Sequence, residues 1–217
     1  MNRYKKLLST LNPQDSFACS KLECIAFILT GQSSLRHSEL TEEQWALLSI
    51  FENFGIPTLK TNFPYNKKHQ YPGAEMPNIV QASVNNGYQY LLSLLDKTYG
   101  ELVYKHLSLY VNQCSQIYIV TGSLGLQMLV KSLIYLRQDC GCKITVFALG
   151  PVTSAPIPGR DNMELITIKG RPDYISRLFD KTRVNYWVDC GHMDYYKNER
   201  VKEIIRGYLN QNYCATS

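Results

Sequence analysis

Residues 117–128, I-Y-I-V-T-G-S-L-G-L-Q-M, combine a strand pattern, small residues and a helical pattern in twelve positions. The first four residues are apolar and favour a strand, and an apolar helical pattern begins after the small residues of positions 121–125. A strand that turns abruptly into a helix holds one side chain in a sharp, exposed corner, which is the setting of a nucleophile elbow. Gly122 and Gly125 supply the small neighbours that such a turn needs. Ser123 is therefore the candidate nucleophile.

The usual form of this motif is G-x-S-x-G, and the position of its first glycine is occupied here by Thr121. Threonine is still fairly small, but the departure weakens the motif. A short G-S-L-G loop is common in proteins, so the alternative is that Ser123 is only a turn residue. The rest of the chain has to decide between the two.

Composition indicates a folded, globular chain. The sequence has 217 residues, of which 45% are hydrophobic and 19% are charged, and its formal net charge is +5. The basic residues are scattered and form no stripe with interleaved aromatics, so we expect no nucleic-acid partner. No long apolar run predicts a membrane span, and no signal peptide is evident. We expect a single cytoplasmic domain covering residues 1–217.

The seven cysteines are an odd number, and buried free thiols are the simplest interpretation for them. The C-x-C pair Cys140 and Cys142 has neither the spacing of a zinc or redox motif nor a partner pair. We therefore expect no metal and no cofactor.

Short apolar runs alternate with helical patterns along the chain. This alternation predicts a mainly parallel sheet of about six or more strands with helices on both faces. The expected strands are residues 24–29, 57–63, 117–120, 143–149, 165–168 and 185–188. The first expected helix starts at Ser38 or Thr41 and ends at residue 54. The other expected helices are two pieces of 77–114 that break near 98–100, and residues 125–137, 174–181 and 199–209.

Polar residues follow successive strands at the edge where α/β proteins place their sites. Ser123 follows the strand at 117–120, Asp173 follows the strand at 165–168, and His192 follows the strand at 185–188. A serine, an acid and a histidine thus occur in this order, each just beyond a strand. In a serine nucleophile, a histidine base takes the hydroxyl proton and the acid holds the histidine tautomer.

Through these residues the chain resembles the α/β-hydrolase superfamily, over roughly residues 24–209. That family has its triad in the order serine, acid, histidine, with the serine on an elbow between a strand and a helix. The resemblance implies a serine hydrolase with the triad Ser123, Asp173 and His192. It also implies that the oxyanion is bound by the backbone N–H groups of Leu124 and Gln32.

Several alternatives remain open at this point. Asp161, Asp189 and Asp194 are rival acids, and Gln32 is uncertain because many relatives have a His-Gly pair where Thr30 and Gly31 stand. The other three histidines are interpreted as surface residues. The tyrosines at 65, 71, 195 and 196 are either pocket walls or ordinary packing residues.

The favoured function is cleavage of an ester or thioester through an acyl-enzyme, with a small-molecule or carrier-bound acyl substrate. Acyl transfer by the same triad and a catalytically inactive binding protein are the alternatives. Residues 150–162 leave no room for a large lid. We therefore expect residues 64–114, including Tyr71 and Met76, to form the wall of the acyl pocket.

Overall fold

The computed structural model describes residues 3–16, 22–32, 34, 37–65 and 79–213. Its centre is a five-stranded parallel sheet, and the strands lie side by side in chain order. The strands are β1 (Cys24–Thr30), β2 (Gln116–Gly122), β3 (Lys143–Leu149), β4 (Met163–Gly170) and β5 (Tyr186–Val188). A parallel sheet covered on both faces needs apolar residues at almost every strand position, and β1 to β3 are almost wholly buried.

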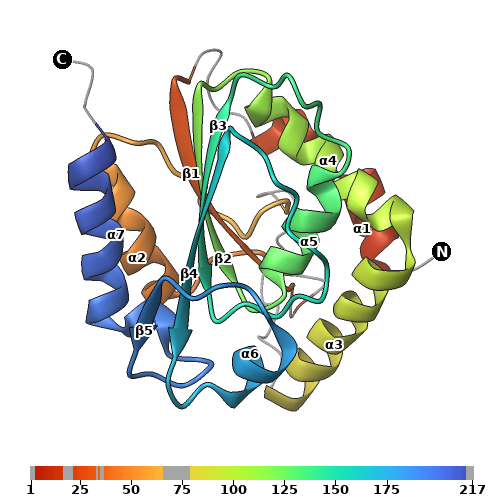
Figure 1. The fold of residues 1–217 in the computed structure, drawn as a ribbon. Coiled ribbons are helices and arrows are strands. Elements are labelled where there is room, and N and C mark those ends of the chain that lie inside the picture. The colour runs from red at the N-terminus through yellow and green to blue at the C-terminus, as the bar shows by residue number, and fades with distance from the viewer. Residues whose placement is uncertain (1–2, 17–21, 33, 35–36, 66–78, 214–217) are drawn as a thin grey trace.

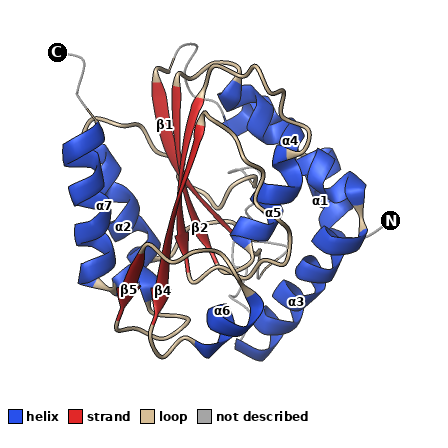
Figure 2. Ribbon diagram, viewed as in Figure 1, coloured by secondary structure: helices blue, strands red, loops and turns tan. Residues whose placement is uncertain are grey.

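Helices cover both faces of this sheet (Figure 1). One face is covered by α2 (Glu42–Asn53) and α7 (Glu199–Asn212), and the other by α4 (Lys97–Val111) and α5 (Gly125–Leu133). Helix α1 (Arg3–Thr10) packs on α4. The longest helix, α3 (Ile79–Leu95), lies outside α4 and α5, and the short α6 (Tyr174–Phe179) lies at the end where β4 points (Figure 2). The α/β class with helices on both faces is thus confirmed.

The strand expected at residues 57–63 is wrong as a regular strand. This segment runs beside β1 and makes only isolated bridges, from Thr58 to Ala26 and from Thr61 to Glu39. Ala26 donates its N–H to the Pro57 carbonyl and accepts from Leu59, so the segment occupies the side of β1 away from β2. Pro57 has no N–H to donate to a strand ladder. Thr61 pairs with Glu39 and not with β1, so the pairing with β1 does not continue as a regular ladder.

The position of this segment fixes the switch point of the sheet. The chain leaves β1, passes outward through α2 to residues 57–63, and returns across α3 and α4 to β2 on the other side of β1. In open α/β sheets, ligands bind beyond the carboxyl ends of the strands at such a reversal. The loops after β1 and β2 meet there.

Two helix boundaries have local causes, the first at a residue other than the expected one and the second at Thr41 as expected. The break between α3 and α4 falls at Asp96 and not near 98–100, because its carboxylate accepts the Thr98 N–H as an N-cap. Helix α2 begins after Thr41, which forms a capping box with Gln44. Between β3 and β4, residues 150–162 contain no helix or strand.

Candidate active site

The corner between β2 and α5 has the backbone of an elbow. Ser123 has φ 48°, the one positive φ of a non-glycine residue in the described part of the chain. Its backbone is fixed on both sides, because its N–H donates to Leu149 O at 3.2 Å and its carbonyl accepts from Val152 N at 2.9 Å. A Cβ added to Gly125 would lie 1.8 Å from Leu29 O, so only glycine fits there. Strain of this kind is held where the surroundings overdetermine it.

The threonine that departs from the usual motif is accommodated. Thr121 is buried in β2, where it pairs with Leu29 and Ala148. A Cβ placed on Gly125 would come within 3.3 Å of the Thr121 Cβ. Because Gly125 has no side chain, there is space beside it for the side chain of Thr121.

His192 connects the elbow serine to a carboxylate. Its Nε2 lies 3.1 Å from Ser123 Oγ, and its Nδ1 lies 3.0 Å from both carboxylate oxygens of Asp173. In the neutral imidazole, an Nδ1–H that donates to the carboxylate makes Nε2 the acceptor for the serine hydroxyl. The structure therefore brings together the three residues that the sequence singled out. The imidazole side chain is 14% exposed, which leaves this chain of hydrogen bonds open to solvent only at its edge.

Asp173 is the N-cap of α6 and is buried. Besides the imidazole, its carboxylate accepts the Tyr195 hydroxyl at 2.7 Å and the Ser176 N–H at 3.1 Å. Burial alone would raise the pKa of Asp173. The hydrogen bonds from His192, Tyr195 and Ser176 outweigh burial and hold this pKa well below its usual range. The side chain thus stays an anion beside the imidazole.

The three rival acids have other partners or none near the imidazole. Asp194 pairs with Lys197 at 2.7 Å, and Asp189 pairs with Arg171 at 3.3 Å on the surface. Asp161 is exposed at the turn before β4. The structure brings none of the three to the imidazole.

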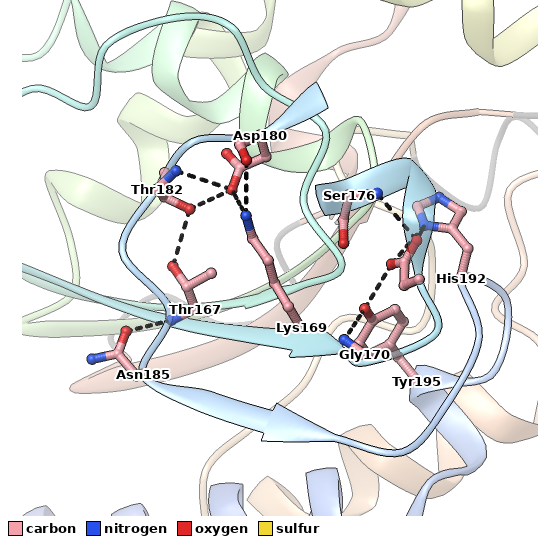
Figure 3. A network of polar contacts seen from close by, with 10 residues as sticks. Thr167, Lys169, Gly170, Ser176, Asp180, Thr182, Asn185, His192 and Tyr195 are labelled. Atoms are coloured by element: carbon pink, nitrogen blue, oxygen red, sulfur yellow. Dashed lines mark hydrogen bonds and ion pairs between the residues drawn. The ribbon is translucent and has the colours of Figure 1, made fainter. Parts of the chain in front are cut away.

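The tyrosine that positions the acid was missed by reasoning from sequence. The Tyr195 hydroxyl donates to Asp173 and accepts the Gly170 N–H at 2.6 Å, so it ties the carboxylate to the end of β4 (Figure 3). Burial raises the pKa of Tyr195, and the neighbouring carboxylate raises it further. The signal available in the sequence was its place three residues beyond His192.

The two backbone N–H groups expected to bind the oxyanion differ in whether they already have a hydrogen-bond acceptor. The Leu124 N–H has no acceptor among the described residues, as an oxyanion donor requires. The Gln32 N–H donates to the side-chain oxygen of Gln89 at 3.0 Å, and the same amide donates back to Gln32 O at 2.6 Å. Tyr4 also donates to Gln32 O, at 3.0 Å. The Gln32 N–H would have to leave Gln89 before it could bind an oxyanion.

The pocket wall expected from residues 64–114 is only partly described. Tyr71 and Met76 lie outside the described residues, and Tyr65 is buried in the core. Helix α3 does reach the site, because Gln89 holds the loop after β1. A Cβ on Gly31 in that loop would lie 2.6 Å from the Asn86 side-chain oxygen. The role of this segment in specificity stays a prediction.

One expected surface histidine is buried. His106 on α4 is 2% exposed, and its Nε2 lies 3.4 Å from Leu8 O. Burial lowers the pKa of His106 to about 4. The surface expectation was wrong because α1 packs over α4, a long-range contact that local sequence does not reveal. His37 is half-buried beside Glu39, and His69 lies outside the described residues.

The described residues contain no group of three or more potential metal ligands. No helix in the described part of the chain is long and apolar enough to cross a membrane. The five described cysteines are free, and four of them are buried.

Similar structures were found although no family model and no curated protein sequence matches the chain. A protein of unknown function from Agrobacterium tumefaciens has 12% identity and a TM-score of 0.50, over 93% of this chain and 98% of its own. An esterase from Pyrococcus furiosus has 13% identity and a TM-score of 0.46, over 87% and 83%. A carboxylesterase from Mesorhizobium loti has 12% identity and a TM-score of 0.42, over 94% and 91%.

The chain has an α/β fold that is similar to that of the Agrobacterium protein. The serine elbow follows β2 at the switch point of the parallel sheet, and the acid and the histidine follow β4 and β5, which is the chain order of the triad in the α/β-hydrolase superfamily. The α/β class with a parallel sheet, predicted from the sequence, is thus confirmed. Identities near one residue in eight establish the fold alone, so the activity is a separate question.

Proposed function

We propose that the protein is a serine hydrolase that cleaves an ester or thioester through an acyl-enzyme intermediate. The observation that carries this proposal is the unbroken chain of hydrogen bonds from Ser123 Oγ through His192 to Asp173, with the serine held at φ 48° on the elbow. A serine hydroxyl becomes a useful nucleophile when a positioned base takes its proton. The substrate class is a small-molecule or carrier-bound acyl group.

In the first half-reaction, Ser123 Oγ attacks the carbonyl carbon while its proton passes to His192 Nε2. The negative charge moves to the carbonyl oxygen, and Asp173 stabilises the imidazolium through Nδ1–H. When the carbonyl reforms, the bond to the leaving alkoxide or thiolate breaks, and Nε2 returns the proton to it. The acyl group then remains on the serine oxygen.

In the second half-reaction, water repeats the attack on the acyl carbon. Its proton passes to His192 Nε2, and collapse of the intermediate returns the proton to Ser123 Oγ and releases the acid. The Leu124 N–H, which has no acceptor in the described part of the chain, is the donor for the oxyanion in both steps. Loss of one such donor typically raises the barrier by about 2.7–4 kcal/mol.

A catalytically inactive binding protein is the second candidate, and one observation favours it. The Gln32 N–H, which is the other expected oxyanion donor, is occupied by Gln89. If this pairing persists with substrate bound, only one backbone donor serves the oxyanion and turnover is weak. Acyl transfer to an alcohol or amine uses the same residues and differs only in the acceptor.

The proposal is tested by hydrolysis of p-nitrophenyl esters and acyl thioesters by wild type and variants. We expect His192→Ala to lower kcat by several orders of magnitude, because triad members act as a unit. Asp173→Asn is expected to lower kcat by about 10⁴, because it favours the wrong histidine tautomer. The matched control is Asp194→Asn, which removes an acid two residues from the histidine and should leave kcat nearly unchanged.

Circular dichroism spectra and denaturation midpoints must show that each variant is folded. Near-normal turnover by Asp173→Asn together with loss of turnover in Asp194→Asn would refute the acid assignment. Absence of hydrolysis by the wild type across both substrate classes would favour the binding protein.

A further inference from the structure

Helix α6 differs from an ordinary surface helix because its polar side faces the protein and its apolar side faces solvent. Its buried side is polar, because Ser176 and the flanking Asp173 and Asp180 are each at most 2% exposed. Its apolar side chains face solvent, with exposed fractions of 75% for Tyr174, 46% for Ile175, 66% for Leu178 and 51% for Phe179. These four positions, spaced i, i+1, i+4 and i+5, share one side of the helix. They are called the α6 face below.

The polar interior explains why the helix turns this way. The Asp173 carboxylate accepts hydrogen bonds from the imidazole and from Tyr195. Asp180 forms an ion pair with Lys169 at 2.6 Å (Figure 3). Both ends of the helix are thus anchored through carboxylates on its inner side. An exposed cluster of large apolar side chains on such a helix has no role in the core, and clusters of this kind mark interaction sites.

The exposed charged side chains of residues 171–183 are all basic. Arg171, Arg177, Lys181 and Arg183 are exposed, whereas the two acids of this segment are buried. Arg177 also lies over the Tyr174 ring, 5.7 Å from its centroid. Arg171 pairs with the exposed Asp189 at 3.3 Å, so the net positive charge of the segment comes from Arg177, Lys181 and Arg183.

The helix that carries the α6 face is joined to the candidate active site through its N-cap. Asp173 is the N-cap of the helix, and Met193, beside the histidine, is 81% exposed. Helix α6 is at the periphery of the fold, at the end where β4 points (Figure 2). Its N-cap Asp173 belongs to the hydrogen-bonded chain that ends at Ser123 Oγ.

We propose that the α6 face binds an anionic lipid surface. Protruding Tyr, Ile, Leu and Phe side chains with flanking Arg and Lys are the composition of segments that lie in a membrane interface. A helical protein partner would be expected to dock in a groove, whereas these side chains stand out from a two-turn helix. The inference extends the proposed function by bringing a lipid-borne ester to the serine, but the binding itself does not depend on catalysis.

The test uses the full chain with Ser123→Ala, so that nothing is turned over. Its binding to phosphatidylcholine vesicles, with and without phosphatidylglycerol, is measured by co-sedimentation. We expect binding to the anionic vesicles to be at least about tenfold tighter and to weaken with salt. Adding Leu178→Glu and Phe179→Glu should reduce it by about tenfold or more. The matched control is Leu95→Glu, at the end of α3, whose side chain is 82% exposed.

Equal binding by the α6-face variant and the Leu95→Glu control would overturn the proposal, as would absence of binding to anionic vesicles. Binding to polyglutamate without binding to vesicles would indicate an acidic protein partner and would also overturn it. A dimer that dissociates in the α6-face variant would overturn it in favour of a second copy of the chain. Loss of esterase activity in every assay with vesicle binding intact would refute only the proposed function.

Discussion

Replacing Tyr195 with phenylalanine removes one hydroxyl from the centre of the site. That hydroxyl donates to Asp173 at 2.7 Å and accepts the Gly170 N–H at 2.6 Å, and the side chain is 2% exposed. A hydrogen bond to a charged group contributes about 1.5–3 kcal/mol, and a buried N–H left without an acceptor costs about 1–3 kcal/mol. The lower ends of the two ranges together predict a loss of about 2.5 kcal/mol in the free energy of unfolding.

Urea unfolding followed by the fluorescence of the two tryptophans measures this loss at pH 7. The matched control is Tyr208→Phe, which removes a hydroxyl that donates to the Glu164 carboxylate at 2.6 Å on the surface. That bond is exposed, so the control should lose less than about 1 kcal/mol. A Tyr195→Phe protein within 0.5 kcal/mol of the wild type, at equal m-value, would refute the reasoning (~0.5 kcal/mol is the usual reach of a surface substitution).

The effect of Tyr195→Phe should also depend on pH. The native pKa of Asp173 is depressed, so its contribution is present above its unfolded value, near 3.9, and is lost as pH falls toward the native pKa. Without the tyrosine hydroxyl this pKa rises toward its usual range. The stability difference between wild type and variant should therefore be full at neutral pH and shrink below about pH 4. A difference that grows on acidification would contradict this account.

Three further predictions concern other buried groups. The folded-state pKa of His106 is about 4, below its unfolded value near 6.5. Acidification through this window therefore lowers the free energy of unfolding of the wild type by about 3 kcal/mol. His106→Gln should remove most of this pH dependence, which urea unfolding at pH 7 and 4.5 measures. Lys169→Met leaves the Asp180 carboxylate buried without its cation and should cost about 3–5 kcal/mol, with part recovered when Asp180→Asn is added; an unchanged denaturation midpoint would contradict this. Gln89→Ala frees the Gln32 N–H and should raise kcat/KM for small esters, with the shape of the pH profile unchanged. A lower kcat/KM would show that the hydrogen bond between Gln89 and Gln32 supports the site.

Much of the sheet was predictable because buried parallel strands are apolar at nearly every position. Strand β3 spans the residues 143–149 that were expected, and β2 leads into the elbow at Ser123 as expected. The segment at 57–63 has a strand-like composition, but its proline and its second bridge leave it outside the regular sheet. Pairing of this kind depends on partners far along the chain, which composition does not specify.

The part of the candidate site that follows from sheet topology was predictable from the sequence. A serine, an acid and a histidine that each follow a parallel strand must meet at one edge of the sheet, and Ser123, Asp173 and His192 do so. What local sequence could not give were side-chain contacts across the fold. The hold of Tyr195 on the acid and the pairing of Gln89 with Gln32 both depend on tertiary packing.

The reversed polarity of α6 was also beyond local sequence. The apolar positions of residues 174–179 predict a helix, but they suggest that its apolar side faces the core. Only the anchoring of Asp173 and Asp180 on the inner side shows that the apolar side faces outward.

Labelling of the folded wild-type protein with a fluorophosphonate, followed by peptide mass spectrometry, shows whether Ser123 is an activated nucleophile. The reagent forms a covalent bond with an activated serine, so we expect one adduct, on the peptide that contains Ser123. His192→Ala should abolish the adduct, whereas Asp194→Asn should retain it. Labelling of another serine, or no labelling of the folded wild type, would contradict the claim that this elbow holds an activated nucleophile.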